Sequence, residues 1–137
     1  MRKDAKLDLL RQVPLFAGCT KKELSEISTL ADELSFPAGT KLIEEGRQGH
    51  EFFLLVDGTV DVQAKGHEPK MLGAGSFFGE MALVSNRPRN ATVTATTPVS
   101  VLVVHESGFR RLLRDSPEIQ LKVLQTLADR AAENALH

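Results

Sequence analysis

The sequence has one cysteine, no excess of charge of either sign and no long apolar run. Cys19 alone can form neither an internal disulfide nor a CxxC metal site, so a small structural role is expected for it. The net charge of -1 provides no basic excess to neutralise nucleic-acid phosphates. The apolar run at 99–104 is far too short to cross a bilayer, and MRKDAKLDLLRQ lacks the apolar core of a secretory signal. We therefore expect a cytoplasmic protein without a membrane segment that does not bind nucleic acid directly.

Helices are expected at both ends of the chain. Leucines at 7, 9 and 10 indicate a short amphipathic helix. Thr20 with Glu23 forms a capping-box pattern before a second helix from Lys21 to about Asp32. Two further helices are expected from Glu106 and, after the Ser116 cap, from Pro117. The last one is expected to bury a single apolar face, made of Ile119, Val123, Leu124, Leu127, Ala131 and Ala135.

The middle of the chain is typical of short strands separated by glycine and proline turns. Val60 and Val62 alternate with polar residues at period two, and Asp57-Gly58 is typical of a tight hairpin turn. Strands are predicted at 41–44, 51–56, 59–64, 91–96 and 99–105, while 69–72 leads from the break at Gly66 into a glycine-rich stretch. The predicted fold is mainly β with flanking α-helices, a small barrel or jelly roll interrupted once by the helix-forming segment 79–85.

The interrupting segment has the chemistry of an anion site. Gly79 permits close backbone approach, and the first amides of a short helix, at Met81 and Ala82, have no partner within the helix. Arg89 supplies a guanidinium that can pair with two phosphate oxygens. Because a carboxylate repels phosphate, Glu80 is expected to accept hydrogen bonds from a neighbouring sugar hydroxyl. The segment has no GxxxxGK[ST] pattern, so one phosphate suits it better than a triphosphate.

Two stretches in register resemble the cyclic nucleotide-binding domain family. LGAGSFFGEMAL at 72–83 and RPRNATV at 87–93 are similar to that family's phosphate-binding cassette. FFLLVDGTVDV at 52–62 is similar to its strand–glycine–strand signature, with FPAGT at 36–40 and VPLF at 13–16 as further matches. The resemblance implies one domain over 1–137, with N-terminal helices at 1–35, an eight-stranded β-roll at 36–105 holding a cassette at 75–93, and C-terminal hinge and lid helices at 106–137.

The same resemblance implies roles for individual residues. Glu80 would bind the ribose 2′-hydroxyl and Arg89 the exocyclic phosphate oxygens, while the purine would lie toward the strands under the last helix. The resemblance further implies a base lid at Arg130, although a solvent-facing arginine is an alternative there, and a contact between Leu83 and Phe109 that couples the cassette to the terminal helices. The backbone amides that complete the anion site would be those of Met81, Ala82, Asn90 and Ala91, next to Gly79.

The leading interpretation is a regulatory receptor and not an enzyme. Family members with threonine at the position of Asn90 often accept cGMP, so the asparagine favours cAMP while leaving cGMP open. The output would pass through the last helix to an unidentified effector domain or protein, and no cofactor is expected. Two alternatives remain: a cupin-type metal enzyme, and a degenerate interaction domain without ligand. The histidines lack metal-ligand spacing, which disfavours the first; they are His50, His67, His105 and His137.

Overall fold

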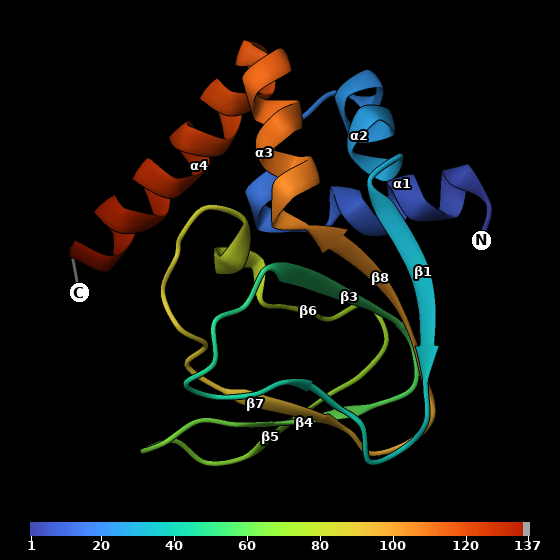
Figure 1. Ribbon diagram of the computed structural model, residues 1–137. Helices are drawn as coiled ribbons and strands as arrows, with labels where there is room; N and C mark the ends of the chain where they lie inside the picture. The colour runs from blue at the N-terminus through green and yellow to red at the C-terminus, as the bar shows by residue number, and fades with distance from the viewer. Residues whose placement is uncertain (136–137) are drawn as a thin grey trace. The chain divides into compact units, whose positions relative to one another are not determined.

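The computed structural model describes residues 1–135, and at 130, 131 and 133–135 it describes the backbone alone. The chain divides into two compact units (Figure 1). One unit is formed by Ala31–Ser107 and contains the strands. The other combines Met1–Leu30 with the chain from Gly108 onward and is helical.

The β unit consists of two four-stranded antiparallel sheets. The first has the order β1 (Ala31–Phe36), β8 (Val99–His105), β3 (Glu51–Asp57) and β6 (Phe77–Phe78). The second has the order β2 (Lys41–Ile43), β7 (Thr92–Ala95), β4 (Val60–Gln63) and β5 (Lys70–Leu72). Eight strands in two sheets with flanking helices confirm the predicted fold class.

An apolar core joins the two sheets. Alternate residues of β8, Val99, Val101 and Val103, belong to it because successive strand side chains point to opposite faces. Phe53 of β3 stacks on Phe78 of β6 with ring centroids 5.4 Å apart. The second sheet contributes Ile43, Val60, Val93 and Ala95 to the same core. The inward faces of the strands therefore hold both sheets together.

Two local predictions were wrong. The helix that starts at Lys21 ends at Ser28, not near Asp32, because β1 begins at Ala31 and pairs with β8 along its whole length. The roll thus starts earlier than residue 36. Asp57-Gly58 does not close a hairpin, since β3 pairs with β6 and β8 whereas β4 pairs with β5 and β7. This turn instead carries the chain from one sheet to the other.

The helical unit is built from short helices around buried aromatic and aliphatic side chains. Its elements are α1 (Lys3–Arg11), the 3₁₀ turn η1 (Pro14–Phe16), α2 (Lys21–Ser28), α3 (Glu106–Asp115, from Gly108 on) and α4 (Pro117–Ala135). Phe16 contacts Phe109 with ring centroids 5.7 Å apart, and Ile119 and Val123 are buried. The prediction for Leu124 was wrong, because this side chain is 61% exposed and lies off the face that Val123 buries. None of the described helices is long and apolar enough to cross a membrane.

The predicted capping box of α2 is present and is linked to α4. Thr20 N–H donates to Glu23 Oε1 at 2.8 Å, and Glu23 N–H donates to Thr20 Oγ1 at 3.2 Å. Lys122 Nζ of α4 donates to the same Glu23 Oε1 at 2.5 Å. The Lys122 ammonium, followed by the Thr20 amide, lowers the pKa of Glu23, and Glu23 raises the pKa of Lys122. The charged pair therefore fastens α4 to the start of α2.

We expect this pair to make the protein less stable in acid. Because the pKa of Glu23 is lowered on folding, its contribution is complete above the ordinary value of 4.5 and is lost as the pH falls through the folded value. When the melting temperature is measured from pH 7 down to pH 3, it should fall less in Lys122→Met than in the native chain. The matched control is Lys22→Met, which removes an exposed lysine of the same helix pair. An identical acid loss in native protein and Lys122→Met would contradict the assignment.

Candidate functional site

Gly79 lies between β6 and the turn that follows it, and its backbone is in the left-handed conformation. Gly79 has φ +79°, a conformation that residues with a side chain rarely adopt. A Cβ here would also lie 2.8 Å from Arg89 Nη1 and 3.0 Å from the carbonyl oxygen of Glu51. The 3₁₀ turn η2 (Glu80–Leu83) follows it and buries Glu80, which is only 8% exposed. Glycine thus lets the turn and Arg89 approach each other closely.

The turn differs from the expected short helix in one functional detail. Ala82 N–H donates to the carbonyl oxygen of Gly79 at 3.1 Å, so the prediction of an unbonded amide at this position was wrong. The i→i+3 pattern of a 3₁₀ turn uses an amide that the first turn of an α-helix would leave open. Among the described residues, the N–H groups of Met81, Asn90 and Ala91 remain without a protein acceptor.

The backbone of Arg89 is held by the loop that precedes β3. Arg89 N–H donates to Arg47 O at 2.8 Å, and Gly46 N–H donates to Arg89 O at 2.8 Å. Next to them, Gln48 forms an isolated antiparallel bridge with Pro88. These contacts hold the main chain on both sides of Arg89 and so fix the position of its Cα, from which the side chain extends.

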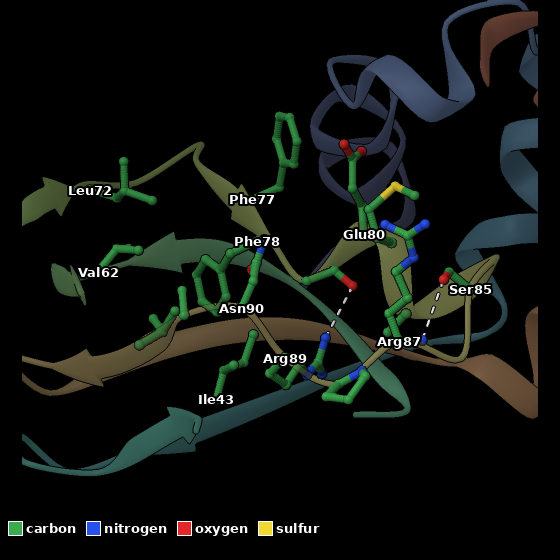
Figure 2. Close-up of a pocket in the computed structure, with 16 residues that line it drawn as sticks. Ile43, Val62, Leu72, Phe77, Phe78, Glu80, Ser85, Arg87, Arg89 and Asn90 are labelled. Carbon is green, nitrogen blue, oxygen red and sulfur yellow. Dashed lines mark hydrogen bonds between the residues drawn. The ribbon is translucent and has the colours of Figure 1, made fainter. Parts of the chain in front are cut away.

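The guanidinium of Arg89 is oriented by backbone carbonyls. Its Nη2 donates to Glu51 O at 2.6 Å. Its Nη1 donates to Gly79 O at 3.4 Å, the bond drawn as a dashed line beside Arg89 in Figure 2. Burial lowers the pKa of Arg89, an effect that the nearby carboxylate of Glu51 opposes. Because an arginine starts from so high a pKa, it stays charged at neutral pH. A guanidinium has five N–H donors, so three remain for an anion after these two bonds.

A cavity of about 490 Å³ lies beside these groups, a size usual for small-molecule sites. In Figure 2, the dashed hydrogen bond from Arg89 ends on the carbonyl oxygen of Gly79, and the carboxylate of Glu80 extends away from Arg89. One side of the cavity is polar and the other is apolar. The apolar side is lined by Ile43, Val62, Leu72, Phe77, Phe78 and Val93.

All seven residues predicted to bind a ligand line this one cavity: Gly79, Glu80, Met81, Ala82, Arg89, Asn90 and Ala91. From the sequence, the apolar side could be predicted only as lying toward the strands. Its individual residues could not be named, because sheet pairing and not proximity in the chain brings their side chains to the cavity. No role was predicted for Arg87, which lines the cavity at an exposed position. Arg87 and Arg89 are the cavity's only cationic lining residues within the described part of the chain, and Glu80 is its only carboxylate.

The other predicted roles involve residues outside this cavity. Leu83 is fully buried in the β unit, and Phe109 is fully buried against Phe16 in the helical unit. Their proposed coupling concerns both units and stays a prediction. Arg130 belongs to α4, but its side chain lies outside the described residues, so the lid also stays a prediction.

His50, one of the four histidines weighed for metal binding, contacts a carboxylate. Nδ1 of His50 lies 2.9 Å from Oε2 of Glu106, and Glu106 N–H donates to His50 O at 2.7 Å. Among the residues that the structure describes, no group of three or more His, Cys, Asp or Glu side chains could hold a metal ion. His50 and Glu106 instead join the start of β3 to the end of β8.

Comparison with known proteins finds a matching family model and similar curated proteins. The model of the cyclic nucleotide-binding domain family matches residues 33–116, which include both sheets except the first residues of β1. The chain is 41% identical over 122 residues to a cyclic nucleotide-gated potassium channel of Rhizobium etli, covering 89% of this chain and 34% of the channel. It is 41% identical over 108 residues to a cAMP-dependent protein kinase regulatory subunit of Colletotrichum orbiculare, covering 77% of this chain and 28% of that subunit.

A solved structure has a similar fold. The N-terminal domain of a transcriptional regulator from Streptomyces coelicolor superposes with a TM-score of 0.82 and 28% identity, covering 93% of each chain. The chain therefore spans nearly all of that domain. It spans only about a third of the length of the channel and kinase-subunit relatives.

Proposed function

Because this chain belongs to the cyclic nucleotide-binding domain family, we propose that its cavity binds a cyclic nucleotide monophosphate, and cAMP more tightly than cGMP. The observation that carries the proposal is that all seven residues expected to hold such a ligand line a single cavity. A buried carboxylate and a carbonyl-oriented guanidinium there match a sugar hydroxyl and a singly charged ring phosphate.

The phosphate would be bound by Arg89 together with backbone amides. The three guanidinium N–H groups not used by Glu51 and Gly79 can form a charge-assisted fork with the two exocyclic oxygens. The amides of Met81, Asn90 and Ala91 have no acceptor among the described residues and can complete the anion site. Ala82 would contribute its small side chain, or its amide after releasing the Gly79 carbonyl.

The sugar and base would occupy the rest of the cavity. Glu80 would accept a hydrogen bond from the ribose 2′-hydroxyl, a contact that a cyclic phosphate leaves available because the ring closes through the 3′ and 5′ oxygens. The purine would lie against the apolar side, where Leu72 and Val62 project from β5 and β4. Asn90, exposed at the cavity edge, would favour adenine only indirectly, by lacking the hydroxyl of a threonine.

The site would serve regulation and not catalysis. A ligand shifts a conformational balance only through its different affinities for the two states, and the terminal helices are the proposed moving element. The relatives named as a channel and as a kinase regulatory subunit support a role in controlling an effector. Arg130 as a base lid and the Leu83–Phe109 coupling belong to this proposal.

Titration calorimetry with cAMP and cGMP tests the proposed ligand. We expect cAMP to bind with a Kd of about 10 μM or tighter, which corresponds to roughly 7 kcal/mol or more, and cGMP to bind more weakly. Saturating cAMP should also raise the melting temperature, because it binds only the folded state. Acyclic 5′-AMP, with its extra negative charge, is the matched ligand control and should bind less well than cAMP.

Two outcomes would contradict the proposal. Failure to detect cAMP or cGMP binding at ligand concentrations near 1 mM would favour the degenerate interaction domain. Conversion of cAMP to 5′-AMP during the titration, especially if stimulated by added divalent metal, would favour an enzyme. Chromatography of the recovered nucleotide separates binding from turnover.

A further inference from the structure

Gly49 occupies a position where its own backbone does not require glycine. It lies in the loop just before β3 and is buried. Six glycines of the described chain have positive φ, and Gly49 is not one of them. The φ angle of Gly49 therefore does not by itself require glycine. The reason for the missing side chain must be sought in the space around it.

That space is filled by the side chain of Arg89. A Cβ built on Gly49 would lie 2.6 Å from Arg89 Cδ and closer still to Nε and Cζ. Real Cβ atoms essentially never approach other heavy atoms within 3.0 Å, so one of the two groups would have to move. The three nearest atoms all belong to Arg89, which makes the arginine the group that an added methyl would displace.

The main chain cannot relieve this contact easily. Arg89 and Arg47 share a 2.8 Å backbone hydrogen bond, and Gln48 is bridged to Pro88. The two segments are therefore joined on the residues next to Gly49. A methyl group at position 49 would therefore displace the side chain of Arg89 and leave the two hydrogen-bonded loops together.

We propose that Gly49 is a positioning residue for Arg89. Because Gly49 has no side chain, the guanidinium can lie against its backbone while Nη2 donates a hydrogen bond to Glu51 O. The missing Cβ of Gly49 allows the Arg89 side chain to lie close to the loop before β3, and the hydrogen bond to Glu51 O orients the guanidinium. The consequence for ligand affinity rests on the proposed function, whereas the contact itself does not. Gly79 differs, because its φ of +79° requires glycine whatever lies next to it.

A double-mutant cycle of Gly49→Ala and Arg89→Ala, measured by thermal unfolding without ligand, tests the contact. In the native background, Gly49→Ala should lower the melting temperature by several degrees. In the Arg89→Ala background, the same change should leave the melting temperature unchanged or raise it slightly, because alanine restricts the unfolded chain and no longer meets the arginine. An equal loss in both backgrounds would overturn the proposal, since the methyl group would then clash with something else.

Calorimetry with cAMP provides the functional readout. Gly49→Ala should weaken cAMP binding at least tenfold at temperatures where the variant is fully folded. Gly18→Ala is the matched control, because Gly18 lies outside the cassette, has no positive φ, and a Cβ there would meet Lys122 only at ordinary contact distances of 3.7 Å or more; the affinity of this variant should stay within twofold of native. Native affinity in Gly49→Ala would overturn the positioning role. Absence of cAMP binding by the native chain would instead reject the proposed function, and the ligand-free cycle would still decide the role of Gly49.

Discussion

Arg89→Ala should weaken cAMP binding by about a hundredfold or more, the cost of roughly 3 kcal/mol expected when one member of a desolvated, hydrogen-bonded charge pair is removed. The rest of the site cannot replace it. The β unit that holds the cavity has six Lys and Arg residues and ten Asp and Glu residues. Its net charge is therefore negative and disfavours binding of an anion. Only Arg87, at an exposed position, would remain as a cationic lining residue.

The effect should be specific to the guanidinium at position 89. Arg47→Ala is the matched control: it removes the same charge from a side chain that is 76% exposed and pairs with Glu44, and cAMP affinity should change little. Arg89→Lys should recover only part of the binding, because an ammonium cannot form the planar fork. A loss of less than tenfold in Arg89→Ala, about 1.4 kcal/mol, would contradict the assigned role. The melting temperature should be followed in parallel, since Arg89 also bonds to Glu51 O and Gly79 O.

The elements that could be predicted from sequence are those with a clear period or a local cap. The capping box at Thr20 and the proline start at Pro117 depend on neighbouring residues, and both helices begin where expected. β1 was missed because Leu30 and Leu34 have helical spacing and most of the strand is exposed. Its strand conformation comes from pairing with β8, whose residues lie about seventy positions away in the chain. β6 has two residues, too few for any period to show.

The candidate site divides in the same way. The shared cavity of the cassette residues could be predicted, because Gly79 to Arg89 is one short segment whose residue types suggest an anion site, and the family resemblance added Asn90 and Ala91. The partners of Arg89 could not, because a main-chain carbonyl at Glu51 and an absent side chain at Gly49 leave no chemical signature in the sequence. The apolar side of the cavity depends on the pairing of β4 with β7 and β7 with β2, which places Val62 near Val93. Such cross-strand neighbours follow from the fold and not from residue order.

Replacing Glu80 with glutamine should weaken cAMP binding by about tenfold to a hundredfold, because a hydrogen bond to a charged acceptor contributes roughly 1.5–3 kcal/mol. The sign of the change is informative. A carboxylate that faced the phosphate would repel it, and its neutralisation would then strengthen binding. A carboxylate that accepts the 2′-hydroxyl loses its charge-assisted bond when it becomes an amide, and binding weakens. Calorimetry on the same cAMP series distinguishes these two geometries.

The 2′-hydroxyl itself gives the matching ligand change. The native protein should bind 2′-deoxy-cAMP at least tenfold more weakly than cAMP, whereas Glu80→Ala should bind both nucleotides with similar affinity, because the group that distinguishes them is gone. Glu68→Gln removes a carboxylate from an exposed turn of the same unit and should keep the native preference. Equal discrimination against the deoxy ligand in native protein and Glu80→Ala would assign the sugar contact to another residue. The buried position of Glu80, at 8% exposure on the cavity wall, leads us to expect loss of discrimination instead.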